Sequence, residues 1–202
     1  MSIISIISGF IITKTVSAGK IMRAQITKSN IETTAVALAA FLANQNRLPR
    51  PSFDDDGRES LESGTNLFNF VGKVPYHSLG ISAKIALDGN GKPLIYMVEP
   101  KLAGNFQSIY ERGMDNYFCS GIFSPSIVIN NIEDPSPDVI AFAIDVHDNP
   151  PVITEKINVR ISSNTSWFSR DRLLMQYLKN RPCKSEIKPT TENSNGAEQF
   201  NF

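Results

Sequence analysis

Apolar residues are unevenly distributed along the chain, which divides into three parts. The first twelve residues carry no charge and are nearly all apolar, whereas residues 184–202 are nearly all polar. A polar end of this kind buries too little apolar surface to offset the entropy lost on ordering, so we expect a disordered tail there. We expect residues 1–24 to form the apolar anchor and assembly part of an N-terminal helix. Residues 25–183 are expected to form a globular domain that includes the amphipathic half of this helix.

The helix itself is predicted from periodicity and from the position of the prolines. No proline occurs from residue 2 to residue 44, and Ile31, Ala35, Leu38 and Leu42 recur at the spacing of one helical face. Pro49 and the next proline forbid continuation of the helix. A helix of about 43 residues is roughly 65 Å long. Because this exceeds the width of a small domain, half of the helix must lie in a membrane or in a helical assembly.

The apolar start allows three interpretations. A stretch of isoleucines interrupted by serine and glycine is typical of a close-packed helix interface in lipid, which we favour. The residues expected to form this assembly helix are Ile3, Ile4, Ile6, Ile7, Gly9, Phe10 and Ile11. A cleaved signal peptide and a soluble core element are the alternatives, although no positive charge precedes the apolar run. Four basic residues follow it, and on the positive-inside rule alone they would keep the C-terminal part in the cytosol.

The middle of the chain contains alternating and continuous apolar runs that predict strands. Residues 93–98 form one, with Tyr96 at its centre, and further candidates are 118–123, 126–130, 138–146 and 153–161. Residues 139–144 are a nearly continuous apolar run, which is typical of a covered central strand. A short last helix is expected from residue 170 to residue 180. The predicted fold class is therefore α+β, with a long N-terminal helix packed on an antiparallel sheet and a short C-terminal helix.

Composition excludes several classes of function. Lys and Arg number 20, as do Asp and Glu, so the formal net charge of the 202-residue chain is zero. A general nucleic-acid binder needs an excess of basic residues, so we expect no nucleic-acid partner. Two cysteines do not suffice for a four-cysteine zinc site. Hydrophobic residues make up 41% of the chain, which is enough for a normal core.

Few residues have the spacing of a catalytic or metal site. The chain has two histidines, His77 and His147, and either one could serve a small soluble enzyme only with a nucleophile and an acid nearby in space. The aspartates at 54–56 and the turn at 88–91 are weak calcium candidates, because neither is followed by the bidentate glutamate of a calcium loop. We expect no catalytic residues, cofactor or metal.

Four segments, in order, carry a resemblance to a known family. They are the helix exit at 44–49, the Val-Pro-Tyr segment at 74–81, the Asp-Gly turn and strand at 88–96, and the Trp-Phe-Ser-Arg segment at 167–173. Together with the long apolar helix, they resemble prepilin-type proteins, meaning type IV pilins and type II secretion pseudopilins. The positions that match the family's motifs are Pro49, Pro75, Tyr76, Leu79, Gly80, Asp88, Gly91, Pro93, Tyr96, Trp167, Ser169 and Arg170.

The start of the chain also resembles the hydrophobic start of a pilin helix, but it departs from the family upstream. The basic leader, the cleavage-site glycine, the methylated phenylalanine and the nearby glutamate are absent before residue 11. We expect a misplaced start codon or a decayed gene, and an engineered truncation is the third option. A chain that truly lacks the leader would be non-functional. In the family the leader supplies the cytosolic positive charge, which places the domain on the other side of the membrane.

The resemblance implies a non-enzymatic structural subunit. Such a subunit crosses the inner membrane once, holds its globular domain in the periplasm and assembles with itself or with other pilin-like subunits through the N-terminal helix. Its partners would be those subunits and the lipid bilayer, with no small-molecule substrate. The resemblance also implies a disulfide between Cys119 and Cys183, and two unpaired thiols are the alternative. A secreted or periplasmic ligand-binding module remains the alternative function, beside the small enzyme.

Overall fold

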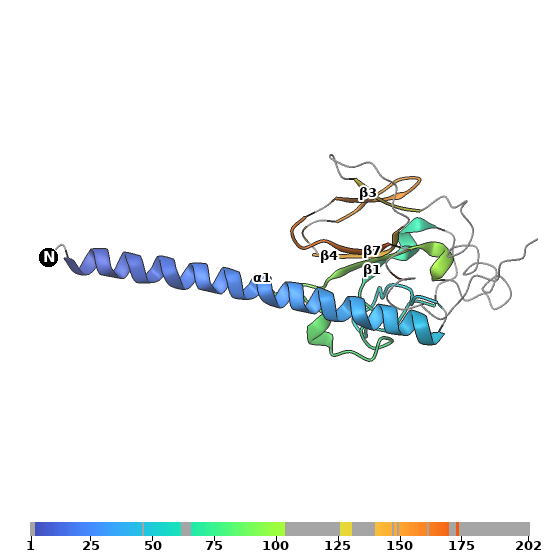
Figure 1. The fold of residues 1–202 in the computed structure, drawn as a ribbon, viewed down its shortest axis with the longest axis horizontal. Helices are drawn as coiled ribbons and strands as arrows, with labels where there is room; N and C mark the ends of the chain where they lie inside the picture. Colours follow the sequence, from blue (N-terminus) through green and yellow to red (C-terminus); the bar gives the residue numbers. More distant parts are fainter. Residues whose placement is uncertain are drawn as a thin grey trace, which may run out of the picture.

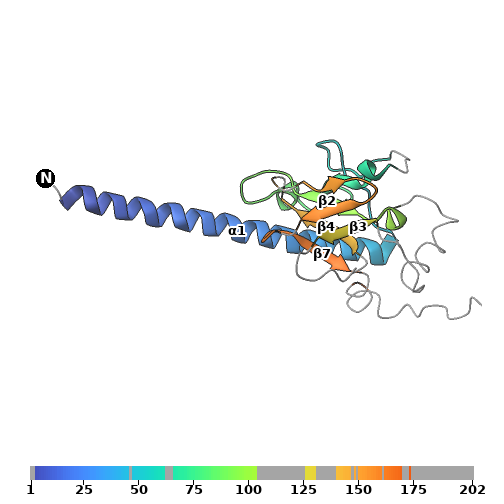
Figure 2. The same ribbon diagram turned by 90° about the horizontal axis from the view of Figure 1, so that it is seen from above.

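The computed structural model describes residues 3–45, 47–61, 66–103, 126–130, 140–146, 148, 150–160, 162–169 and 173. For residues 3–17 it describes the helical backbone alone. One long helix, α1 (Ile3–Gln45), extends far beyond a domain built from two sheets (Figure 1; Figure 2). The predicted α+β class is confirmed, and the finer comparison with pilins remains a prediction.

The helix α1 is continuous over 43 residues and ends four residues before Pro49, as the sequence predicts. Its second half is amphipathic, and the buried side chains recur at helical spacing. These buried residues are Ile31, Ala35, Leu38, Ala39 and Leu42. Their burial against the domain holds this half of the helix in place, since most helical stability in proteins comes from packing of the apolar face.

The main sheet has four strands in the order β1 (Val71–Lys73), β2 (Ile95–Val98), β4 (Ile140–Asp145) and β7 (Ser166–Ser169), and all its neighbours are antiparallel. Every residue of β4 is buried, which confirms the predicted central strand. Strand β2 confirms the strand predicted around Tyr96. Strand β7 was not among the predicted strands, and it pairs with β4 through Ser166, Trp167, Phe168 and Ser169.

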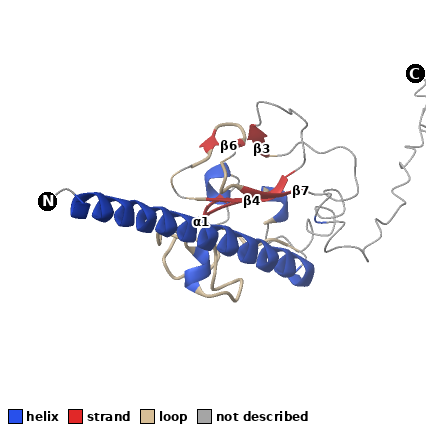
Figure 3. Cartoon of the chain, turned by 60° about the vertical axis from the view of Figure 1, so that its left-hand side comes forward, coloured by secondary structure: helices blue, strands red, loops and turns tan. Residues whose placement is uncertain are grey.

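A second sheet contains β3 (Ile127–Asn130), β6 (Ile157–Arg160) and β5 (Val152–Ile153), in that order. Strands β3 and β6 are parallel, whereas β5 and β6 are antiparallel. The expectation of one strand over residues 153–161 is therefore wrong. The chain turns back at 154–156, where the Thr154 amide donates to the Lys156 carbonyl at 3.0 Å. The main sheet lies between α1 and the second sheet (Figure 3).

The described residues also include three short 3-10 helices: η1 (Leu67–Phe70) before β1, η2 (Ala83–Ala86) between β1 and β2, and η3 (Pro100–Leu102) after β2. The core of the main sheet includes Phe142, whose ring centroid lies 4.9 Å from that of Phe168. The expected C-terminal helix at 170–180 lies outside the described residues except for Leu173, which is helical and buried. The expected strand at 118–123 and the expected tail at 184–202 also lie outside the described residues.

Candidate functional site

The place where α1 leaves the domain is fixed by a very close backbone contact. The turn at 88–91 lies directly against the helix, and the Gly89 amide donates to Thr27 Oγ1 at 2.8 Å. A side-chain Cβ at Gly89 would lie 2.7 Å from the Arg23 Cα and nearer still to the Arg23 carbonyl oxygen. Only glycine allows this approach, because real Cβ contacts below 3.0 Å essentially never occur.

A second contact lies one turn further along the helix. The Asn30 side-chain amide donates to the Lys84 carbonyl at 3.1 Å and to the Leu87 carbonyl at 2.7 Å. Both carbonyls belong to the segment formed by η2 and the residue that follows it. This segment and the turn at 88–91 therefore hold the same stretch of α1, just before the buried half of the helix begins.

The face of α1 that points away from the domain is exposed and carries no charge. Its residues recur at i, i+4, i+7, i+11 and i+14, opposite the buried face. They are Met22, Ile26, Ser29, Thr33 and Val36, and we call them the outer face. Met22 is 65% exposed and Val36 is 54% exposed. The Thr33 hydroxyl donates to the Ser29 carbonyl at 2.8 Å, so this polar group is satisfied within the helix.

The N-terminal half of α1 projects beyond the domain (Figure 1). The predicted assembly residues lie on this half, from Ile3 to Ile11, where the structure places the backbone in a continuous helix. In the part of the chain that the structure describes, no helix has the length and hydropathy needed to cross a membrane.

The family-motif residues that directly follow β1 hold the turns in place. The Tyr76 hydroxyl donates to the Asp55 carbonyl at 2.8 Å, and Pro75 is buried beside it. Leu79 packs against the core, and Gly80 follows with a φ of 68°. These contacts give the segment at 74–81 a structural role, and its histidine, His77, is exposed.

The later motif residues also have structural contacts. Asp88 Oδ1 accepts from the Asn90 and Lys92 amides, each at 2.8 Å, which closes a turn that includes Gly91 with a φ of 81°. Pro93 forms an isolated bridge with Leu87 after this turn.

On the main sheet, Tyr96 is fully buried, and its hydroxyl donates to the Pro49 carbonyl at 3.1 Å. Burial raises its pKa well above the ordinary value. In β7, Trp167 lies opposite Ala143 of β4, and Ser169 lies opposite Ile140 of β4. Arg170, Cys119 and Cys183 lie outside the described residues.

The helix exit contains an ionic cluster that sequence reasoning missed. Arg47 forms a two-pronged ion pair with Glu59, with a distance of 2.6 Å between Nη1 and Oε2. The Arg50 amide donates to the same carboxylate at 3.2 Å. Burial would raise the pKa of Glu59, but the hydrogen bonds and charge of Arg47, with the Arg50 amide, outweigh burial and lower it. No motif marks such a pair, because its members come from a polar loop and a helix end.

A second missed group is Glu99, which follows β2 directly and is fully buried. It accepts hydrogen bonds from the Ser126 amide at 2.8 Å and from the Ser126 hydroxyl at 3.0 Å. Burial raises the pKa of Glu99, and the Ser126 hydrogen bonds only partly oppose this. This carboxyl connects the two sheets, since Ser126 leads into β3. A charged residue at the end of a buried strand was the available signal.

The 54–56 aspartates, which were weak calcium candidates, and the aspartates on either side of His147 have contacts within the domain. Asp55 in the 54–56 loop pairs with the Lys73 ammonium at 2.6 Å, and Asp148 pairs with Lys92 at 2.7 Å. Asp145, which precedes the second histidine, accepts a hydrogen bond from the Thr165 hydroxyl at 2.9 Å. His147 lies outside the described residues. Within the described part of the chain, no group of three or more His, Cys, Asp or Glu residues is placed to hold a metal ion.

Comparisons with protein-family models, with curated proteins and with solved structures give no match to this chain.

Proposed function

We propose that this protein is a non-enzymatic, prepilin-like structural subunit. Its helix α1 would cross the inner membrane once, place the domain in the periplasm and pack against the helices of neighbouring subunits. The observation that carries this proposal is the division of α1 into two halves. One half is buried against the main sheet, while the other projects as continuous helix with an apolar sequence.

The sequence of the projecting half supports the proposal that this half lies in an environment other than water. Residues 3–19 contain a single charged residue, Lys14, and correspond to about 26 Å of helix at 1.5 Å per residue. This length approaches the hydrocarbon thickness of a bilayer, which is about 30 Å. The long side chain of a lysine near one end can reach the polar interface. An isolated helix gains little stability in water, so lipid or partner helices give this half a reason to be apolar.

The outer face supports helix assembly beyond the membrane. Serine and threonine allow close approach between helices, and Met22, Ile26 and Val36 supply apolar contact area. The absence of charge on this face removes the desolvation cost that a partner helix would otherwise meet. The enzyme alternative would use His77 or His147; His77 is exposed, and its backbone amide donates to the Gly57 carbonyl at 2.8 Å.

Membrane fractionation of the full chain tests the anchor. We expect the protein to stay in the membrane after carbonate washing. Replacing Ile7→Asp and Ile11→Asp should release it, because an aspartate near the centre of a spanning helix costs about 3 kcal/mol. The matched control places the same two charges on exposed domain positions, Ser82→Asp and Thr154→Asp, and should remain bound. Recovery of the unaltered chain in the soluble fraction would contradict the proposal and favour a soluble binding module.

Cross-linking tests assembly separately. A Thr33→Cys variant places a thiol on the outer face of α1, and an Ala83→Cys variant places one on the exposed surface of η2. We expect disulfide-linked dimers above the wild-type background for the first variant only, in membranes from cells that express the protein. Equal cross-linking of the two variants would argue against packing through the outer face.

A further inference from the structure

In the stretch of α1 that follows its apolar N-terminal segment, the charged residues before Glu32 are all basic. Lys14, Lys20, Arg23 and Lys28 all precede Glu32, which is the first acidic residue of the chain. Lys20, Arg23 and Lys28 are exposed in the structure. Lys20 and Arg23 stand seven and four residues before the buried Thr27, and Lys28 stands seven residues before the buried Ala35. All three therefore lie on the domain-facing side of the helix and leave the outer face uncharged.

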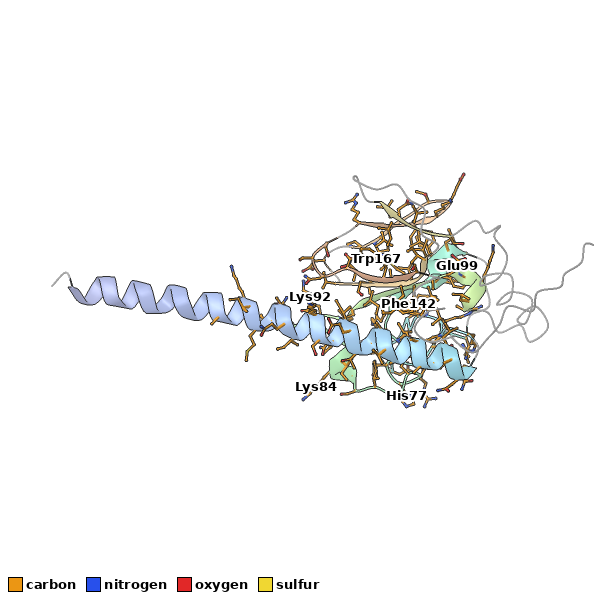
Figure 4. All side chains as sticks on the ribbon, viewed as in Figure 1. His77, Lys84, Lys92, Glu99, Phe142 and Trp167 are labelled. Carbon is orange, nitrogen blue, oxygen red and sulfur yellow. The ribbon has the colours of Figure 1, made fainter. Side chains whose placement is uncertain are left out.

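The domain adds basic residues at the same level of the helix. The Lys84 carbonyl accepts from Asn30, which places Lys84 beside α1, two residues beyond Lys28 along the helix. The turn that contacts Thr27 through Gly89 continues into Lys92. Figure 4 shows Lys84 and Lys92 at the end of the domain from which the helix projects. The basic residues of the helix and of the domain therefore form one band.

Several carboxylates lie near this band, and Glu32 is one helical turn beyond Lys28 on α1. Asp148 pairs with Lys92, and the buried Asp88 accepts hydrogen bonds from backbone amides. None of the ion pairs formed between described residues involves the other cations of the band. We call these residues the basic collar: they are Lys20, Arg23, Lys28 and Lys84.

We propose that the basic collar binds the headgroups of anionic phospholipids and so holds the domain against the membrane surface. This inference rests on the proposed membrane anchor, because the anchor brings the collar to the surface. Lys20 directly follows residues 3–19, in which Lys14 is the only charged residue, so it lies at the expected hydrocarbon boundary. Lys28 lies about 12 Å further along the helix. The collar therefore spans the headgroup layer and roughly one Debye length of about 8 Å beyond it.

A lipid surface fits this arrangement better than a soluble polyanion. The collar residues of α1 follow its apolar N-terminal segment and extend over about 12 Å of helix, where the proposed anchor would leave the membrane. The chain as a whole carries no net charge, so it lacks the long-range attraction typical of nucleic-acid binders. The outer face stays free of charge, which leaves helix packing and headgroup binding on different sides of α1.

Partitioning of the full-length protein between vesicles tests the proposal. One set of vesicles contains phosphatidylcholine alone, and the other also contains phosphatidylglycerol. We expect a preference for the anionic vesicles that declines with added salt, with each surface cation contributing roughly fivefold in affinity. Arg23→Gln with Lys84→Gln should reduce the preference by about 25-fold. Replacing all four collar residues with glutamine should abolish it. Circular dichroism confirms that each variant keeps its helix.

The matched control removes two cations elsewhere on the domain, Arg58→Gln and Lys156→Gln, both at exposed positions. It should keep the anionic preference of the unaltered protein. Equal partitioning of the unaltered protein into both vesicles would overturn the proposal, as would an unchanged preference in the four-residue variant. If the control pair lost the anionic preference to the same extent, the effect would come from net charge, and the proposal would also be overturned. Failure to bind neutral vesicles would instead contradict the proposed anchor, and it is measured independently of the preference.

Discussion

Replacing Gly89 with alanine should separate α1 from the domain at the point where the helix emerges. The added Cβ would meet the helix backbone at Arg23, whose Cα and carbonyl carbon both lie 2.7 Å from the Cβ position. These atoms belong to a hydrogen-bonded helix, so they cannot rotate away as a flexible side chain would. The turn at 88–91 must therefore retreat to reach an ordinary contact distance of 3.4–4 Å.

The retreat affects three hydrogen bonds. It removes the Gly89 bond to Thr27 and strains the two bonds from Asn30 to the neighbouring segment. Each such bond contributes about 0.5–1.5 kcal/mol to stability, so the expected loss is about 2–4 kcal/mol. For a protein of this size each kcal/mol shifts the Tm by about 2–4 °C, which predicts a decrease of roughly 5–15 °C.

Thermal unfolding followed by circular dichroism, in one detergent for all variants, measures the effect. Gly19→Ala is the matched control, because it is the same substitution within α1 and its Cβ would meet nothing within 4 Å. This control should leave the Tm unchanged or raise it, since alanine is favoured over glycine in a helix by about 1 kcal/mol. If Gly89→Ala unfolded at the wild-type temperature, the close contact with the helix would be refuted.

Three further substitutions test the interior. Burial holds the folded-state pKa of Glu99 above its ordinary value of 4.5, so the stability of the wild-type protein should fall as the pH rises from 4.5 through the raised pKa. In urea unfolding, Glu99→Gln should remove this decline. An unchanged pH profile in the variant would contradict the assignment to Glu99. The pKa of Glu59 is lowered, so its stabilising effect should be present above pH 4.5 and lost as the pH falls. Glu59→Gln should therefore cost about 1–3 kcal/mol at neutral pH and less in acid, and an equal cost at both would count against the ion pair with Arg47. Leu38→Ala should cost about 2–5 kcal/mol in the same assay, whereas the exposed Val36→Ala should change stability by less than about 0.5 kcal/mol, and similar costs for both would refute the assigned helix orientation.

The long helix and the central strand were predictable because their signals are local. Apolar residues at helical spacing around Leu38 define the buried face of α1, and the continuous apolar run at 139–144 defines β4. The hairpin of β5 and β6 was missed because its turn at 154–156 contains no glycine, proline or asparagine. The parallel pairing of β3 with β6 joins residues about 30 positions apart, and no local pattern specifies it.

The candidate site was predictable only in part. The apolar start and the basic residues after it are visible in the sequence, but their position relative to the domain is not. The contact of Gly89 with Arg23 depends on a turn and a helix that are 66 residues apart, since 89 − 23 = 66. The burial of Glu99 and its hydrogen bonds to Ser126 likewise depend on tertiary packing. Sequence patterns identify which residues an element contains, whereas these contacts arise only when distant elements meet.

Because the second half of α1 packs lengthwise on the domain, its direction also determines how the protein would respond to a pulling force. From Ile31 to Leu42 the helix lies lengthwise on the domain, and Asn30 and Gly89 hold it at the near end. A pull on the projecting half therefore acts parallel to this contact and loads its side chains together in shear, instead of peeling them away one at a time. Tension applied to the helix would therefore reach the domain through several buried side chains of α1 at once.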